Sequence, residues 1–144
     1  MKIVVDASVF LAFAIPEERE HGEAARFFAF CETENHQILF PTLAMAEVAG
    51  GVARRKRDSD KADMAVARMR RLAGVRFCPL SEEAAEAGAK LAGRCLLRGA
   101  DAVYCQIALA KGIPLVTFDL EIRERVDGVV TAFSPQAWVE SLRT

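Results

Sequence analysis

The sequence has few of the side chains that usually carry zinc or acid–base chemistry. Among its 144 residues are only two histidines, His21 and His36, and four cysteines, with no Cys-x-x-Cys pair and no His-Glu-x-x-His segment. Because zinc sites need Cys or His ligands at short regular spacings, we do not expect a zinc centre. We expect surface histidines and reduced, buried cysteines that pack as small hydrophobic residues. The cysteines are Cys31, Cys78, Cys95 and Cys105.

The sequence also lacks net charge and aromatic residues. Its formal net charge is −1, and it has one Trp and one Tyr. A chain with almost no net charge exerts no long-range attraction on phosphate, so any affinity for nucleic acid needs local basic clusters or bound metal. Hydrophobic residues make up 52% and charged residues 27%, which is typical of a folded globular protein. We expect residues 1–144 to form a single domain around one core.

No apolar stretch approaches the ~20 residues that a transmembrane helix needs. Lys2 precedes an apolar segment ending at residues 11–14, which superficially resembles a signal peptide. The charge of Asp6 in the middle of that segment argues against a signal. We therefore expect a soluble, cytoplasmic protein without membrane contact.

Short apolar runs alternate with stretches of helical periodicity. The runs, the last of them weaker, lie at residues 2–6, 37–40, 75–78, 114–118 and 128–131. The first is nearly continuous and β-branched, as in a strand buried on both faces. Helical patterns include residues 20–34 and a stretch from a cap at Ser81 to about residue 97, where we expect Gly99 to break the chain. The alternation predicts a three-layer α/β/α sandwich with a mostly parallel sheet of four to five strands.

Two aspartates come at the ends of predicted strands. Asp6 closes the first strand, and Asp119 directly follows the run at residues 114–118. Because ligands of open α/β sheets bind beyond the carboxyl ends of the strands, both aspartates are candidate site residues. Each also has an ordinary explanation as the N-cap of the next helix.

Two further acids lie in otherwise apolar predicted helices. Glu47 is surrounded by small and apolar residues, and Gly50 and Gly51 beside it indicate a close approach of backbone or ligand. Asp101 enters the first turn of an apolar helix, where the amide dipoles favour its ionised form. Solvent exposure of Glu47 and simple charge matching by Asp101 remain open alternatives.

Four carboxylates in one crevice would need a cation. A pair ~5 Å apart repels by roughly 3 kcal/mol at an effective dielectric constant of 20. An oxygen-only ligand set favours Mg²⁺ or Mn²⁺ over zinc. Ser8 and Thr117 are placed to orient a carboxylate or a bound water, although a helix cap and a strand position explain them equally well. We predict that a metal-activated water attacks a phosphodiester at a site built from Asp6, Glu47, Asp101 and Asp119.

Five motifs in order along the chain resemble those of the PIN-domain nucleases, and within them the VapC toxins of toxin–antitoxin pairs. They lie at residues 3–9, 16–18 with 24–25, 46–48, 99–102 with 107–108, and 114–119. The resemblance implies that the four acids coordinate Mg²⁺ or Mn²⁺ and that Ser8 and Thr117 support them. It also implies a PIN-like fold, an endoribonuclease that cleaves RNA, a homodimer and a cognate antitoxin. Residues 120–125 depart from the pattern, because they lack the basic residue often found early in that loop.

Two runs of basic residues are available to bind phosphate. They are Arg54, Arg55, Lys56 and Arg57, and the later group Arg68, Arg70 and Arg71. Clusters of this kind often hold single-stranded RNA. The first run also lies where positive charge stabilises a helix C-terminus, so a solvated helix end and contact with an acidic antitoxin remain open.

These features are compatible with three functions. The first is the RNA-cleaving toxin, and the second is a non-toxin PIN-like or other metal-dependent phosphoryl-transfer enzyme, such as a DNA nuclease or phosphatase. The third is a non-catalytic module that binds RNA or protein. The second is disfavoured because Asp6-Ala7-Ser8 supplies only one carboxylate at the end of the first strand, where an Asp-x-Asp pair would supply two, and because no phosphate-binding glycine loop is present. The third is disfavoured because a binding module gains nothing from four mutually repelling acids.

Overall fold

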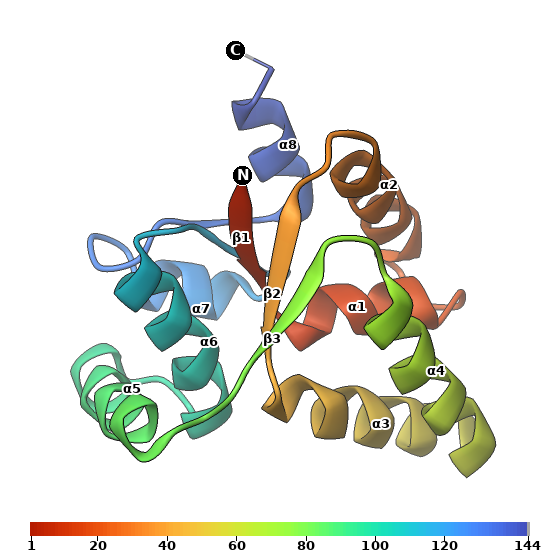
Figure 1. Cartoon of the computed structure of the whole chain (residues 1–144), viewed down its shortest axis with the longest axis horizontal. Helices are drawn as coiled ribbons and strands as arrows, with labels where there is room; N and C mark the ends of the chain where they lie inside the picture. The colour runs from red at the N-terminus through yellow and green to blue at the C-terminus, as the bar shows by residue number, and fades with distance from the viewer. Residues whose placement is uncertain (144) are drawn as a thin grey trace.

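The computed structural model describes residues 1–143, which form a five-stranded parallel sheet with helices on both faces (Figure 1). In chain order the elements are β1 (Lys2–Val5), α1 (Ala7–Ala14), α2 (His21–Thr33), β2 (Gln37–Pro41), α3 (Leu43–Lys56), α4 (Ser59–Arg71), β3 (Val75–Cys78), α5 (Glu82–Cys95), α6 (Gly99–Lys111), β4 (Leu115–Val116), α7 (Leu120–Arg125), β5 (Ala132–Phe133) and α8 (Pro135–Ser141). The predicted α/β/α arrangement is confirmed, and every strand pairing is parallel. Within the described residues, no helix combines the length and the apolar character needed to cross a membrane.

The strand order, β3-β2-β1-β4-β5, places the first strand at the centre of the sheet. The chain builds outward from β1 through β2 to β3, then returns to the other side of β1 with β4 and β5. Because parallel crossovers are right-handed, this reversal moves the helices to the opposite face. Figure 1 shows α1–α4 on one side of the sheet and α5–α7 on the other. The carboxyl ends of β1 and β4 are neighbours at the reversal, the usual ligand-binding point of such sheets.

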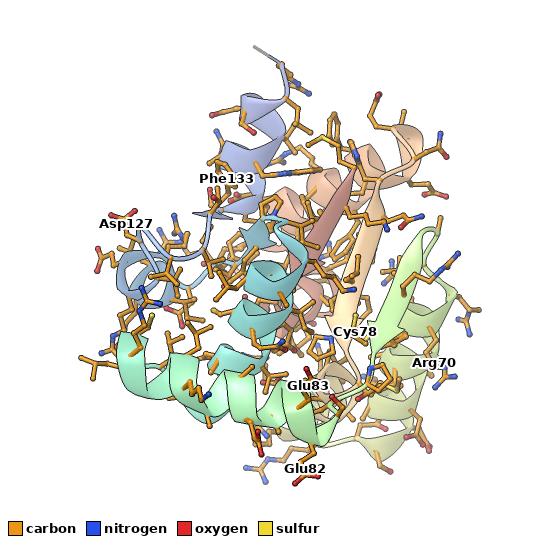
Figure 2. The ribbon with its side chains drawn as sticks, turned by 60° about the vertical axis from the view of Figure 1, so that its left-hand side comes forward. Arg70, Cys78, Glu82, Glu83, Asp127 and Phe133 are labelled. Carbon is orange, nitrogen blue, oxygen red and sulfur yellow. The ribbon has the colours of Figure 1, made fainter. Side chains whose placement is uncertain are left out.

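The central and edge strands differ in burial. Ile3, Val4 and Val5 of β1 are fully buried, so both faces of this strand are covered. Fully burying one such side chain stabilises the fold by about 1.5–3 kcal/mol. At the edges, Arg76 of β3 is exposed and Phe133 of β5 is only partly buried (Figure 2). A continuous apolar run therefore marks a central strand, as predicted for residues 2–6.

Two boundaries in the second half of the chain differ from the prediction. The last strand is Ala132–Phe133, whereas residues 126–129 form a turn, in which Gly128 has φ +78°, and residues 130–131 are irregular. The apolar signal there came from Val130, which is buried in the core without strand geometry. The break after α5 occurs at Leu96, which adopts a left-handed φ of 58°, and Gly99 is instead the first residue of α6.

The cysteines are free thiols, as expected. Cys31, Cys95 and Cys105 are buried, and Cys78 at the end of β3 is partly buried (Figure 2). Burial raises the pKa of Cys31 and of Cys105 to about 12. Their thiolates are therefore scarce at neutral pH, and the thiols are inert.

The expectation of surface histidines is wrong for His36. This residue is buried between Phe30 of α2 and Trp138 of α8, with ring centroids 5.6 Å and 5.0 Å away. Its Nδ1 lies 3.2 Å from the N-terminal amine, and burial lowers its pKa, which favours the neutral ring. The local sequence could not show this burial, because Trp138 comes from the other end of the chain.

Candidate metal centre

A pocket of about 410 Å³ lies beyond the carboxyl ends of β1 and β4. It is lined by all four predicted acids, which come from the end of β1, from α3, from the first turn of α6 and from the cap of α7. These are Asp6, Glu47, Asp101 and Asp119. The fold therefore brings widely separated carboxylates to one pocket at the point where the winding of the sheet reverses.

Asp6 is the most deeply buried of the four, with only 7% of its surface exposed. Its extended backbone, with φ −74° and ψ 148°, continues β1 to the pocket before α1 begins. Burial raises the pKa of Asp6, since desolvation disfavours the charged form. Hydrogen bonds from Ser8 and Thr117 oppose that rise, and the negative charge of Asp101 adds to it. Asp6 is thus a carboxylate held in surroundings that favour an added positive charge.

Thr117 connects two of the acids. It is fully buried, its Oγ1 donates to Oδ2 of Asp6 at 2.9 Å, and the same oxygen accepts from the backbone N of Asp119 at 3.0 Å. Oγ of Ser8 lies 3.5 Å from Oγ1 of Thr117 and accepts from the backbone N of Phe118 at 3.4 Å. These hydroxyls occupy the places expected of groups that orient a carboxylate.

Glu47 is partly buried and is held by a tyrosine that sequence reasoning missed. The hydroxyl of Tyr104 on α6 donates to Oε1 of Glu47 on α3 at 2.7 Å. Burial raises the pKa of Glu47, the Tyr104 bond lowers it, and the charges of Asp6 and Asp101 raise it further. Free solvent exposure is therefore excluded for Glu47. The available signal was that the chain's only tyrosine follows Asp101 by three residues on the same apolar helix.

The two glycines after Glu47, Gly50 and Gly51, have different structural roles. A Cβ at Gly51 would lie 2.7 Å from Cδ2 of Leu11, so this glycine allows α1 and α3 to pack closely. A Cβ at Gly50 would lie 3.1 Å from Nη1 of Arg54, whose guanidinium therefore rests beside the bare backbone. The predicted close approach is real, and at Gly51 it is an approach between helices.

Arg98, also missed from sequence, contacts the other two acids. Its Nε lies 3.0 Å from Oδ2 of Asp101, and its Nη2 lies 3.7 Å from Oδ2 of Asp119. Oδ1 of Asp119 caps α7 by accepting from the backbone N of Glu121 and of Ile122. The ordinary helix-end roles of both aspartates therefore coexist with their place in the pocket. Arg98 also supplies positive charge beside Asp119, where residues 120–125 lack an early basic residue.

The donor set consists of oxygens only, which suits Mg²⁺ or Mn²⁺. Across residues 1–143, no three His, Cys, Asp or Glu side chains lie close enough together to hold one ion. Glu47 is turned to Tyr104, and Asp101 and Asp119 are turned to Arg98. Shared coordination therefore requires some of these side chains to turn from their present partners toward a common ion.

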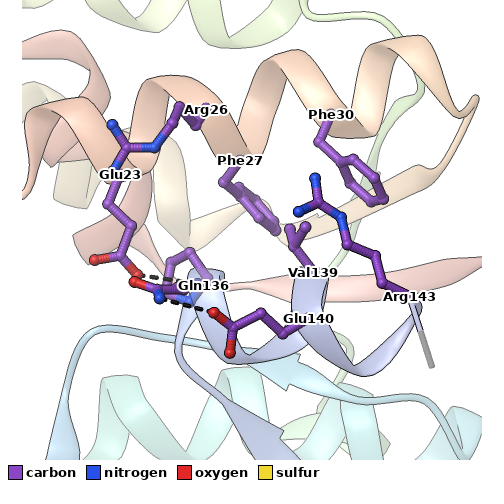
Figure 3. A pocket seen from close by; sticks show the side chains of 9 residues that line it. Glu23, Arg26, Phe27, Phe30, Gln136, Val139, Glu140 and Arg143 are labelled. Atoms are coloured by element: carbon purple, nitrogen blue, oxygen red, sulfur yellow. Dashed lines mark hydrogen bonds between the residues drawn. The ribbon is translucent and has the colours of Figure 1, made fainter.

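A second pocket, of about 290 Å³, lies between α2 and α8 (Figure 3). Phe27 and Phe30 line it, and Gln136 is paired with two of its acids. The backbone N of Gln136 donates to Glu23 at 2.9 Å, and its side-chain Nε2 donates to Glu140 at 2.8 Å. This pocket lies near the amino ends of the strands, so the acidic pocket is the stronger candidate for chemistry.

The comparisons with known proteins agree with this architecture. The family model of the PIN domain matches residues 3–128. Mycobacterium tuberculosis VapC20, described as a sarcin–ricin loop cleaving toxin, superposes with a TM-score of 0.74 at 23% identity, covering 89% of this chain and 96% of that chain. Neisseria gonorrhoeae FitAcB gives 0.70 at 20% identity, covering 93% and 98%. Rickettsia felis VapBC2, bound to a promoter DNA fragment, gives 0.69 at 11% identity, covering 93% and 98%. None of the curated proteins compared matches the sequence.

Proposed function

The chain belongs to the PIN domain family, and from that premise we propose that it is an Mg²⁺- or Mn²⁺-dependent endoribonuclease whose residues 1–144 act as one PIN-like domain. Members of this family are generally nucleases. The observation that carries the proposal is the gathering of four acids in one pocket at the carboxyl ends of β1 and β4. The proposed metal ligands are Asp6, Glu47, Asp101 and Asp119.

The residues around the acids fit them for this role. When bound, the ion supplies a water of lowered pKa and neutralises charge that develops on the phosphodiester. Thr117 fixes the orientation of Asp6, and Tyr104 holds Glu47 at the pocket through one oxygen, Oε1. The helix-cap bonds hold Oδ1 of Asp119, which leaves Oδ2 directed toward the pocket side occupied by Arg98. No side-chain nucleophile is needed for this reaction.

RNA is the proposed substrate for two reasons. The sequence motifs resemble those of VapC toxins, and the similar VapC20 structure is described as a toxin that cleaves the sarcin–ricin loop. In addition, Arg54, Arg55 and Arg98 line the same pocket as the acids, which suits a polyanionic substrate. A cytoplasmic location is part of the same proposal.

Hydrolysis assays on RNA, DNA and a small phosphate ester, run side by side with Mn²⁺, test this function. We expect cleavage of RNA alone, no cleavage in excess chelator, and a fall on the order of 100-fold or more for Asp6→Asn and for Asp101→Asn. Full activity in either variant would place the site elsewhere. Preferential hydrolysis of DNA or of the ester would favour another phosphoryl-transfer enzyme. A chain that neither binds Mn²⁺ in calorimetry nor hydrolyses RNA would be a binding module.

The proposed partner is a cognate antitoxin, and the resemblance also supports a homodimer. Similar structures include a toxin–antitoxin complex from Klebsiella pneumoniae. A groove of about 500 Å³ lies beside α3 and α4 and is lined by the exposed Met64 and by the cations Lys61, Arg68 and Arg71. This combination of apolar and positive side chains suits an acidic amphipathic segment. Growth arrest on expression, relieved by the product of an adjacent small reading frame, would support the toxin role. Sedimentation of the purified chain tests the dimer.

A further inference from the structure

Of the four basic residues at the end of α3, Arg54 to Arg57, two form ion pairs. Nε of Arg55 lies 2.9 Å from Glu18, and Nζ of Lys56 lies 2.6 Å from Glu17. Both glutamates belong to the loop between α1 and α2, so these two cations tie that loop to α3. Arg57 ends the helix with a left-handed φ of 51° and does not line the acidic pocket.

Arg54 differs from the other three. It lines the acidic pocket, its side chain is exposed, and within residues 1–143 it forms no ion pair. Side chains on a helix lean toward its N-terminus, so Arg54 extends back over the preceding turn. Gly50 lies in that turn, and its missing Cβ leaves the place that the guanidinium occupies. The charge of Arg54 is thereby carried toward the end of α3 that holds Glu47.

The other two arginines of the pocket are already paired. Arg98 is held by Asp101 and Asp119, and Arg55 is held by Glu18. Arg54 can therefore bind an incoming anion without first breaking an ion pair, whereas Arg55 and Arg98 cannot. Its planar guanidinium matches the oxygens of a phosphate in a two-point contact.

We propose that Arg54, seated on Gly50, binds a backbone phosphate of the RNA next to the scissile one. This inference rests on the proposed ribonuclease function. Glu47 and Arg54 are seven positions apart, or about 10 Å along the axis of α3, and both side chains lean toward the same end of the helix, so the separation of their charged groups favours a neighbouring phosphate over the reacting one. Arg54 thus acts on substrate binding and positioning, and less on the chemical step.

Substitution of Arg54, with Arg57→Gln as the matched control, tests the assignment. RNA affinity is measured by fluorescence anisotropy in chains that also carry Asp6→Asn, so that the RNA stays intact. We expect Arg54→Gln to weaken binding about tenfold and to reduce the slope of log affinity against log salt by about 0.7, the value for one phosphate contact on a single strand. Arg57→Gln should change neither quantity. In the active enzyme, Arg54→Gln should raise KM about tenfold and leave kcat within about threefold.

Two further variants separate a phosphate contact from a structural role. Arg54→Lys keeps the charge and should recover part of the affinity, although it loses the two-point geometry. Gly50→Leu keeps Arg54 but fills the space beside Gly50 that its guanidinium occupies, and should weaken RNA binding as Arg54→Gln does. Circular dichroism melts of each variant check that the fold is intact.

The outcomes distinguish the two proposals. If the unsubstituted chain cleaves RNA while Arg54→Gln and Arg57→Gln bind it equally well, the assignment of Arg54 is overturned and the ribonuclease function stands. A loss of kcat with unchanged KM and salt slope also overturns it, because Arg54 would then act by holding Glu47. If the chain neither cleaves nor binds RNA, both proposals fail together.

Discussion

Asp6 is the clearest example of a site residue that lowers the free energy of unfolding. Burial raises its pKa above the ordinary 3.8, so the folded chain holds the proton more tightly than the unfolded chain does. Stability is therefore lost as pH rises from the unfolded pKa through the folded one, and it stays lost at neutral pH. Burial acts in the same direction on Glu47. The site costs stability because it keeps carboxylates ionised where solvent is scarce.

We predict from this that Asp6→Asn is more stable than the unsubstituted chain at pH 7 in chelator. Each tenfold difference in proton affinity between the folded and unfolded states corresponds to about 1.4 kcal/mol. The advantage should disappear below pH 3.8, where the aspartate is protonated in both states. Urea unfolding of both chains, at pH 7 and below pH 3.8, measures this difference in the free energy of unfolding. Equal or lower stability of the variant at pH 7 would show that burial of Asp6 carries no such cost.

The residue types of the site could be predicted, but not all of their contacts. Asp6 and Asp119 follow apolar strands, a position that made both of them candidates for the site while leaving an N-cap role open for each. The hydrogen bond from Tyr104 to Glu47 joins helices that belong to opposite sides of the sheet. No local pattern encodes that meeting, because it depends on how α3 and α6 come together beyond the strand ends.

At the scale of elements, the contact between α1 and α3 sets the close packing beside the site. The sequence indicated a close approach at the glycine pair without indicating which partner approaches. At Gly51 the partner is Leu11, whose side chain packs against the core, and at Gly50 it is the flexible end of Arg54. The sequence likewise predicted the order of helices and strands, but Gly128 and Leu96 set boundaries through their backbone conformations.

Alanine at the two glycines should therefore have opposite effects on stability. Alanine normally stabilises a helix by up to about 1 kcal/mol relative to glycine, and we expect such a gain for Gly50→Ala. Gly51→Ala should instead destabilise the chain by about 1–3 kcal/mol, because its Cβ would lie 2.7 Å and 2.9 Å from the two methyl carbons of Leu11. Thermal and urea unfolding of the pair give the comparison. Equal stability would mean that Leu11 moves aside freely.

At the scale of the whole molecule, strand order decides whether the acids meet. Apolar runs identify strands, but they do not show which strands are neighbours. The order β3-β2-β1-β4-β5 makes β1 and β4 adjacent, and so places Asp6 beside the segment that carries Asp119. The convergence of the acids could be expected from the general behaviour of α/β sheets, whereas the pairing itself required the structure.

This arrangement predicts that metal binding stabilises the molecule as a unit. An ion shared by the acids would connect the end of β1, α3, α6 and the start of α7, which come from both sides of the sheet. Any ligand of the folded state alone raises the free energy of unfolding, by about 2.7 kcal/mol at a concentration 100-fold above its Kd. We therefore expect Mn²⁺ to raise the Tm of the unsubstituted chain by several degrees.

The same Mn²⁺ titration of two variants distinguishes binding of the ion at the site from a general effect of cations on Tm. Asp6→Asn, which should start from the higher Tm in chelator, should gain little from Mn²⁺, so the order of the two melting curves reverses as the ion is added. Asp127→Asn removes an acid from the turn after α7, outside the pocket, and should respond as the unsubstituted chain does (Figure 2). An equal rise in Tm for all three chains would assign the stabilisation to surface binding. It would then contradict coordination by Asp6 directly, whatever the chain does to RNA.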